Sequence, residues 1–275
     1  MKYIFMISAL ASIFAVALIC FFLFANGLPA LFKIGVFDFL LGREWSPSDV
    51  PPLFGIFPMI LGSICVTLGA IMVGLPLGIF TAVFMAHMCP KRFYYILKPA
   101  VDLLAGIPSV VYGFFGIVVL IPLVRTTFGG NGSSILTASL LLGVMILPTI
   151  ISVSESSLRA VPQELYDGAL ALGASHERAV FGIILPAAKS GVLAAVVLGV
   201  GRAIGETMAV IMILGNAVAV PGSILDPVRT LTTNIGIEMG YASGEHRQAL
   251  FATGIVLFVI IMILNASAQF ITRKK

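Results

Sequence analysis

Six apolar runs, each long enough to cross a lipid bilayer as a helix, take up most of this 275-residue chain. A helix needs roughly 20 apolar residues to cross the hydrocarbon core. The runs cover residues 3–25, 58–86, 100–124, 135–154, 187–217 and 249–271. Only 10% of the residues are charged, which excludes an average soluble domain, and the alternating pattern of a membrane barrel is absent. The sequence therefore predicts an all-α polytopic membrane protein with six transmembrane helices.

The connecting segments divide the chain into three parts. Residues 1–57 are expected to hold one helix and an extracytoplasmic segment, residues 58–271 a core of five helices, and residues 272–275 a basic tail. The first apolar run is longer than the roughly 7–15 residues of a signal peptide. We therefore expect an uncleaved membrane anchor.

Basic residues in the loops indicate the orientation. With both termini in the cytoplasm, ten of the 16 basic residues fall on the cytoplasmic side and five on the outer side. Cytoplasmic loops carry an excess of Lys and Arg, so we expect both termini and the 272–275 tail to be cytoplasmic. Membrane lipid surrounds such a chain, and no nucleic-acid partner is expected because the basic residues form no patch.

Two outer segments, 26–57 and 218–248, are long enough to carry structure of their own. Amphipathic helices lying at the membrane surface are one explanation. Docking sites for an extracytoplasmic partner are the other, and composition leaves both open.

A charged pair, Arg202 and Glu206, interrupts the fifth apolar run in GVGRAIGETMAV at 199–210. On a continuous helix, residues four apart share a face, so the two side chains are expected to pair. An uncompensated charge at mid-membrane costs about 2.5–3.5 kcal/mol, so such residues pair or line a water-filled path. A guanidinium suits phosphate-like anions because it can donate two parallel hydrogen bonds. Two interpretations stay open: an anion pathway in which Glu206 positions Arg202, and a neutral pair that fixes helix packing.

Other polar residues are candidates for the same pathway. Asp102, near the start of the third run, either belongs to the cytoplasmic interface, lines the pathway or pairs with a basic residue of another helix. Hydroxyl groups of Ser109, Tyr112 and Thr149 can bind an oxyanion, although such hydroxyls commonly bond their own backbone. The candidate pathway residues are Arg202, Glu206, Thr207, Asp102, Ser109 and Tyr112.

Residues 162–186, PQELYDGALALGASHERAVFGIILP, form a polar interruption on the cytoplasmic side. Pro162 fits a first helical position, Gly173 fits a left-handed helix stop, and Ser175 fits a helix cap with Glu177 in its first turn. The segment predicts two short helices joined at a glycine. Such an element suits contact with a soluble partner.

Neither a catalytic site nor a metal site is predicted. The chain contains no G-x-x-x-x-G-K-[ST] loop and no hydrolase motif, and its three Cys and three His residues are scattered. We therefore expect a non-catalytic subunit that binds no cofactor itself, with any ATP and Mg²⁺ bound by a separate polypeptide.

The 162–186 segment resembles the "EAA" signature of permease subunits in bacterial ATP-binding-cassette importers. Asp167-Gly168-Ala169 is followed after three residues by Gly173 and after nine more by Ile183-Ile184-Leu185-Pro186, which reproduces the spacing of that signature. Asp167 replaces a Glu, and Gly168 replaces an Ala. The resemblance implies a type I importer permease fold for 58–271, with a coupling helix that docks on the ATPase. The residues implied in coupling are Glu164, Asp167, Gly168, Ala169, Gly173, Ala174, Ile183, Leu185 and Pro186.

Several further segments resemble permeases of phosphate-specific importers, in particular the PstC type. These segments are GREWSP at 42–47, PLGIFTAVFMAH at 76–87, AGIPSVVYGFFG at 105–116, GRAIGETMAV at 201–210 and EMGYASGEHRQALFATGIVLF at 238–258. The resemblance implies phosphate import through the bacterial inner membrane, with a second permease as heterodimer partner, two ATP-binding subunits and an extracytoplasmic phosphate-binding protein. ATP binding would open the pathway outward, and hydrolysis would reset it inward. Alternatives are the sister PstA-type permease, a permease for sulfate or molybdate, and an ATP-independent secondary anion transporter.

Overall fold

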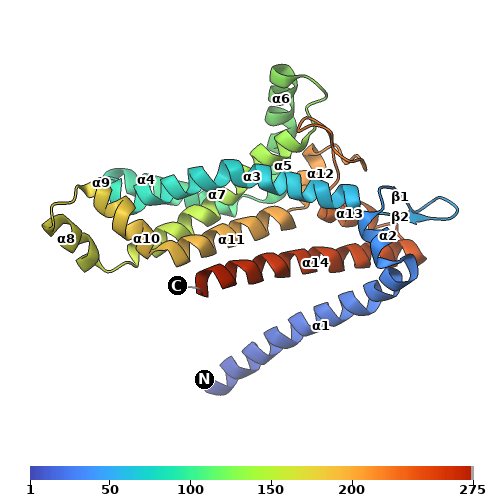
Figure 1. Cartoon of the computed structure of the whole chain (residues 1–275), viewed down its shortest axis with the longest axis horizontal. Coiled ribbons are helices and arrows are strands. Elements are labelled where there is room, and N and C mark those ends of the chain that lie inside the picture. Colours follow the sequence, from blue (N-terminus) through green and yellow to red (C-terminus); the bar gives the residue numbers. More distant parts are fainter. Residues whose placement is uncertain (274–275) are drawn as a thin grey trace.

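The computed structural model describes residues 1–273 and is helical apart from one short hairpin (Figure 1). The α-helices and strands before the central helix are α1 (Lys2–Ile34), α2 (Val36–Leu41), β1 (Trp45–Ser46), β2 (Leu53–Phe54), α3 (Phe57–Val83), α4 (Lys91–Gly106), α5 (Ser109–Phe115) and α6 (Ile121–Phe128). The remaining α-helices are α7 (Ile135–Arg159), α8 (Gln163–Ala171), α9 (His176–Ala179), α10 (Leu185–Ala187), α11 (Lys189–Gly205), α12 (Met208–Ile213), α13 (Leu231–Glu238) and α14 (Gly244–Arg273). Three π-helical turns continue α3, α5 and α9: η1 (Phe84–Met88), η2 (Gly116–Leu120) and η3 (Val180–Ile184). Lys274 and Lys275 of the predicted basic tail lie outside the described residues.

Five helical stretches within residues 1–273 are long and apolar enough to cross a membrane. They are Lys2–Ile34, Phe57–Met88, Ser109–Phe128, Ile135–Arg159 and Gly244–Ser267. A sixth is reached if His176–Ala187 and Lys189–Gly205, which meet at a bend of 70°, count as one broken span. The predicted all-α membrane class is confirmed, and the predicted number of six agrees with this second way of counting.

The predicted single span at 100–124 is wrong. α4 ends at Gly106, Ile107 takes an extended conformation, and a new helix begins after Pro108. A proline disfavours the helical conformation in the residue before it, which explains the break. Figure 1 shows α4 running alongside α7, whereas α5 and α6 run across the direction of the long helices.

The predicted end of the first helix near residue 25 is also wrong, because α1 continues to Ile34. Its second half packs against α14, where the rings of Phe22 and Phe251 meet edge to face at 5.5 Å between centroids. Gly27 permits this approach, since a Cβ there would lie 2.9 Å from the backbone nitrogen of Ala252. The first half of α1 has no buried residue and diverges from the bundle (Figure 1).

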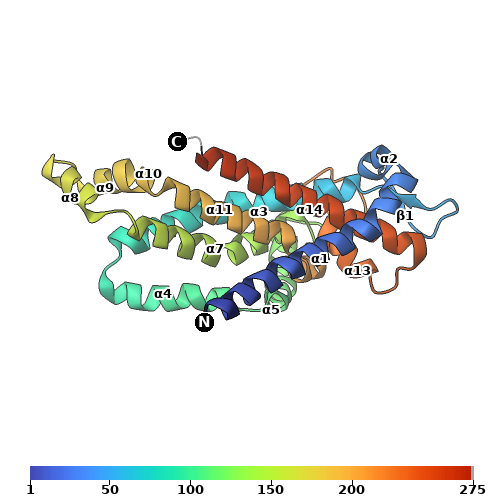
Figure 2. The ribbon, with the colours of Figure 1, turned by 90° about the horizontal axis from the view of Figure 1, so that it is seen from below.

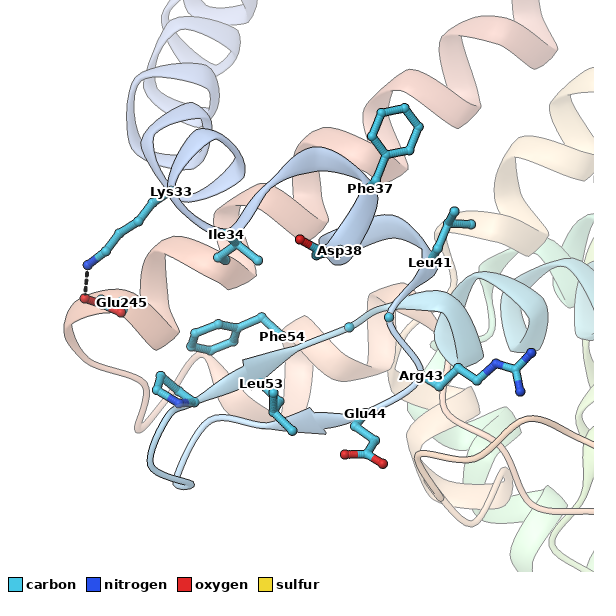
Figure 3. A pocket seen from close by; sticks show the side chains of 13 residues that line it. Lys33, Ile34, Phe37, Asp38, Leu41, Arg43, Glu44, Leu53, Phe54 and Glu245 are labelled. Atoms are coloured by element: carbon cyan, nitrogen blue, oxygen red, sulfur yellow. Dashed lines mark hydrogen bonds and ion pairs between the residues drawn. The ribbon is translucent and has the colours of Figure 1, made fainter.

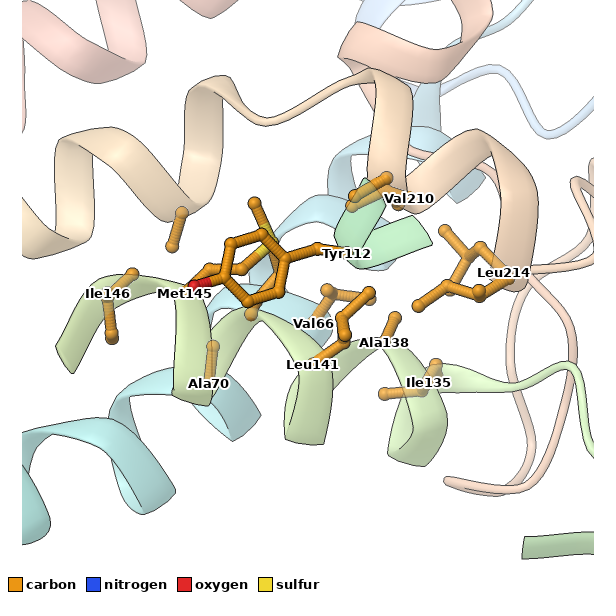
Figure 4. Packing of buried hydrophobic residues seen from close by; sticks show 14 of the residues in the cluster. Val66, Ala70, Tyr112, Ile135, Ala138, Leu141, Met145, Ile146, Val210 and Leu214 are labelled. Carbon is orange, nitrogen blue, oxygen red and sulfur yellow. The ribbon is translucent and has the colours of Figure 1, made fainter. Parts of the chain in front are cut away.

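The core is centred on α7, which packs between α3 and α11. Small residues bring these backbones together, as in other membrane helices. A Cβ on Gly74 of α3 would lie 2.7 Å from the carbonyl oxygen of Gly143, and one on Gly199 of α11 would lie 2.9 Å from Ile150. Figure 4 shows the resulting apolar cluster, in which Tyr112 lies among side chains of α3, α7 and α12.

The two ends of the bundle differ. One end carries α8 and α9, and the opposite end carries α2, the hairpin and α13 (Figures 1 and 2). Trp45 pairs with Phe54 and Ser46 with Leu53 in the antiparallel hairpin. From the hairpin end, α1 and α14 both extend toward the α8 end, so the first residues of α1 and the last residues of α14 lie on the same side of the hairpin. We call the α2, hairpin and α13 end the outer cap, after the side of the membrane predicted for residues 26–57 and 218–248.

Candidate functional site

The fifth apolar run is broken at the predicted charged pair. α11 ends at Gly205, Glu206 is extended (φ −67°, ψ 133°), and α12 starts at Met208. Glycine is a poor helix former, which favours an end at this position. The expectation of one helix over 187–217 is therefore wrong.

The predicted ion pair between Arg202 and Glu206 is wrong for the same reason, since only a continuous helix places residues four apart on one face. The Glu206 carboxylate instead accepts a hydrogen bond from the backbone nitrogen of Ala209 at 3.3 Å and so caps α12. Arg202 is half-buried and donates to the Thr149 hydroxyl on α7 at 3.4 Å. Within residues 1–273 no carboxylate forms an ion pair with Arg202.

Arg202, Thr149 and Tyr112 come together from three helices. Tyr112 packs in the same buried cluster as Ala203, the neighbour of Arg202, and its hydroxyl donates to the carbonyl of Leu104 at 2.9 Å. Ser109 is half-buried at the first turn of α5, and the Thr207 hydroxyl bonds the carbonyl of Gly205 at 3.3 Å. Tyr112 thus bonds a backbone carbonyl of α4 rather than of its own helix, and a role for these hydroxyl groups in binding an anion stays a prediction.

The bare backbone of α11 faces open space beside Arg202. A Cβ on Gly201 or Gly205 would meet no other atom of the described chain within 4 Å, in contrast to Gly199. Gly106, at the end of α4, is equally open. This side of the site is therefore not closed by the chain itself.

Asp102 lies on α4, with its side chain 55% exposed, and pairs at 3.3 Å with Lys98 one turn earlier. Of the three expectations for this residue, pairing with a basic residue occurs, but on its own helix rather than on another. The pocket that Asp102 lines lies at the junction of α4 and α5 with Gly106 and Pro108.

Beside Asp102, a buried acid that the sequence analysis did not select joins α4 to α7. The side chain of Glu155 is 3% exposed, accepts from Tyr94 at 2.7 Å and from Arg159 at 2.9 Å, and lies 3.3 Å from Lys98. Burial acts to lower the pKa of the Lys98 ammonium. The carboxylates of Glu155 and Asp102 together have the larger effect, so the pKa is raised. The bond to Glu155, with burial, raises the pKa of Tyr94. Only the spacing of Glu155 and Arg159, four residues apart, gave a sequence signal for this cluster.

The predicted helix–glycine–helix element is present as α8, Gly173 and α9. Gly173 has φ 87°, and the bonds from Gly173 to Leu170 and from Ala174 to Ala169 form a Schellman stop. Ser175 caps α9 by accepting from the Arg178 nitrogen at 3.3 Å. Pro162 lies one position before the helix rather than in its first turn.

Most of the residues predicted to act in coupling are exposed. Glu164, Asp167, Gly168 and Gly173 are exposed, whereas Ala169 faces inward and is 4% exposed. Leu172 at the tip is 92% exposed. Further along the motif, Ile183 and Pro186 are exposed and Leu185 and Ala174 are half-buried.

An aromatic contact that the sequence analysis missed fastens this element to the bundle. The Tyr166 hydroxyl on α8 bonds Nδ1 of His176 on α9 at 2.7 Å, and the Tyr166 ring stacks on His87 from η1. The histidines were treated as scattered residues, because sequence alone does not place α8 beside the end of α3.

At the outer cap, Glu238 is the centre of a second polar cluster. It accepts from Trp45 at 2.8 Å and from Arg229 at 2.6 Å, and lies 2.7 Å from His246. The ion pair of Lys33 and Glu245 closes one side of a cavity of about 780 Å³ between α1, α2 and the hairpin (Figure 3). The outer segment 26–57 thus forms a built cap with exposed Phe37 and Leu41. Whether it docks a partner stays a prediction.

Comparison with known families identifies the class of protein. The family model described as "Binding-protein-dependent transport system inner membrane component" matches residues 74–275. The chain is 38% identical to the probable ABC transporter permease protein YqgH of Bacillus subtilis, over 97% of this chain and 88% of that one. It is 34% identical to the phosphate transport system permease protein PstC of Mesorhizobium japonicum, over 90% of this chain and 81% of that one.

Solved structures support the same fold. A chain of the bacterial alginate ABC transporter, crystallised with a periplasmic protein bound to an alginate pentasaccharide, aligns with TM-score 0.64 at 15% identity, over 99% of this chain and 96% of that one. A chain of the inward-facing MetNI methionine ABC transporter aligns with TM-score 0.60 at 21% identity, over 80% of this chain and 93% of that one. These likenesses concern the fold alone.

Proposed function

The chain belongs to the binding-protein-dependent transport system inner membrane component family, and from this premise we propose that it forms half of the transmembrane pathway of an ATP-driven phosphate importer. The full-length similarity to permeases named for phosphate transport supports the substrate. The chain acts as a non-catalytic subunit whose ATP and Mg²⁺ are bound by partner ATPases.

The observation that carries the proposal is Arg202, a half-buried cation beside Thr149 with no carboxylate partner in the described chain. A positive charge at this depth costs about 2.5–3.5 kcal/mol unless something compensates it. A phosphate ion compensates it well, because the planar guanidinium donates two parallel hydrogen bonds to its oxygens. The break at Glu206 and the open, exposed backbone at Gly205 give an anion room to approach.

The coupling element supports an ATPase partner. Exposed Asp167, Gly168 and Leu172 lie at the tip of α8, at the end of the bundle opposite the outer cap. We place this end in the cytoplasm of a bacterial cell, with both termini on the same side. Two ATP-binding subunits then contact this chain and a second permease, and a phosphate-binding protein contacts the outer cap. ATP binding moves α8 and opens the pathway outward, and hydrolysis returns it inward.

Uptake by the reconstituted transporter tests this function. The chain is co-expressed with its second permease and ATPase, and proteoliposomes are assayed with the binding protein for labelled phosphate, sulfate and molybdate. ATP-dependent uptake selective for phosphate is the expected result. Preference for another oxyanion refutes the substrate, and uptake by this chain alone without ATP makes it a secondary transporter.

A further inference from the structure

α13 is a polar helix in the interior of a membrane domain. Thr232, Thr233, Asn234 and Glu238 are all at most 7% exposed. Its first turn is fastened to α3, because the backbone nitrogen of Leu231 donates to the Ser63 hydroxyl at 3.0 Å. Burying polar groups costs free energy unless each is bonded, so such a helix is held in a defined position by its partners.

The outer end of α13 is bonded to the hairpin. The indole nitrogen of Trp45 donates to Glu238 at 2.8 Å, and Arg229 donates to the other carboxylate oxygen at 2.6 Å. Trp45 itself is 8% exposed and packs edge to face on Phe54 at 5.6 Å. The hairpin lies outside residues 74–275, which the family model matches.

α13 touches the break of the fifth run at two points, one in its first turn and one near its C-terminal end. The Thr232 hydroxyl donates to the carbonyl oxygen of Glu206 at 2.9 Å. One turn later, a Cβ on Gly236 would lie 2.8 Å from the methyl group of Thr207, so this glycine leaves room for that side chain. Both contacts fall on the two residues that separate α11 from α12.

We propose that α13 connects the outer cap to the break beside Arg202, and that Trp45 is a positioning residue for the translocation pathway. Trp45 fixes Glu238 at one end of the eight-residue helix, and Leu231 forms the other end. An α-helix of this length is a rigid element of about 12 Å. Displacement of the hairpin therefore shifts Thr232 and Gly236, and with them the backbone at Glu206 and Thr207. This proposal depends on the proposed function only for the identity of the transported ion.

Accessibility of a thiol at the break tests the connection without any transport assay. In the assembled transporter, Cys20, Cys65 and Cys89 are replaced by Ser and Gly205→Cys is introduced, because position 205 faces open space. The rate of labelling by a membrane-impermeant maleimide, added from the outer side, is then compared in Trp45→Phe, Thr232→Val and Gly236→Ala. Each variant loses or distorts one contact, and we expect each to change the rate about fivefold, the effect of one hydrogen bond.

Matched controls lie nearby. Gly240→Ala adds the same methyl group at a site where nothing lies within 4 Å, and Thr126→Val removes an exposed hydroxyl that bonds only its own helix. Both are expected to label within about twofold of the parent, the scatter of independent sites. Thr232→Ser retains the hydroxyl and is expected to restore the parent rate. Only variants that co-purify with the second permease and the ATPase are compared. If one test variant fails to assemble, the other two test variants decide.

A double variant shows whether the two substitutions act through the same connection or each act only locally. If α13 links the sites, Trp45→Phe combined with Thr232→Val changes the rate by clearly less than the product of the single changes, whereas independent sites multiply to within about twofold. Unchanged labelling in the three test variants, or strict multiplication, overturns the proposal. Because labelling requires neither phosphate nor uptake, a transporter of another anion still passes this test, and failure here leaves phosphate import intact.

Discussion

The guanidinium of Arg202 on α11 reaches the hydroxyl of Thr149 on α7 at 3.4 Å, while the carboxylate of Glu206 bonds the start of α12. A neutral hydroxyl orients a cation but does not neutralise it. The charge of Arg202 is therefore available to a mobile anion. This geometry favours the pathway interpretation over a neutral pair that fixes helix packing.

Arg202→Gln is expected to reduce phosphate uptake about 10- to 100-fold, since hydrogen bonds to charged groups contribute roughly 1.5–3 kcal/mol. Arg202→Lys retains the charge but loses the two-pronged geometry, so an intermediate rate is expected. Initial rates of labelled phosphate uptake measure the effect, and co-purification with the partner subunits controls for assembly. Parental uptake in Arg202→Gln makes the residue a packing element.

Gly173→Val is expected to uncouple ATP hydrolysis from transport. The φ of 87° favours glycine, and a Cβ meets no other atom within 4 Å, so the cost is backbone strain at the helix stop. The measurement is the number of ATP molecules hydrolysed per phosphate imported. Gly129→Val is the matched control, because it has φ 84° and equal space but lies after α6, away from α8. An equal ratio in both variants refutes a specific role for Gly173.

Tyr166→Phe removes the hydroxyl that bonds His176 at 2.7 Å and leaves the ring that stacks on His87. Loss of one such bond costs about 1 kcal/mol. We expect the ratio of hydrolysis to transport to rise several-fold while the complex remains assembled. Tyr95→Phe, at a ring 76% exposed on α4, is the control. If both phenylalanine variants behave like the parent, the contact is not part of coupling.

Glu155→Gln is expected to lower the thermal stability of the purified complex. The change leaves Lys98 and Arg159 without their shared buried carboxylate, and breaking a buried ion pair costs about 3–5 kcal/mol. Asp102→Asn removes only an exposed pair with Lys98, worth about 0–1 kcal/mol. The unfolding midpoints of the two variants give the comparison. A larger loss in Asp102→Asn contradicts the central role assigned to Glu155.

Local patterns in the sequence predicted much of this structure. The apolar runs gave most of the spans, and the Gly173 stop and Ser175 cap were recognisable because each depends only on residues a few positions away. The predicted Arg202–Glu206 ion pair is wrong because a spacing of four residues places two side chains on one face only where the helix continues, and α11 ends at Gly205. The pathway role of the two residues stays a prediction, whereas the continuous helix assumed between them is wrong.

Clusters formed by distant segments were not predictable from these patterns. Trp45 and Glu238 are separated by 193 positions, and Tyr94 and Glu155 by 61. Nothing in their own neighbourhoods specifies the partner, which depends on the order in which the helices pack. In the structure the two clusters are recognised by their acids, because Glu155 and Glu238 are charged side chains that are buried.

The isolated charge of Arg202 also bears on how a cell keeps its membrane sealed. A guanidinium stays protonated throughout the physiological pH range. The inside-negative voltage of a bacterial membrane pulls protons and sodium inward through any watery gap, and a fixed positive centre raises the electrostatic barrier to them. In the proposed transporter, the group that attracts the anion thereby also keeps cations out of the pathway, so a turnover need not drain the ion gradients on which the cell depends.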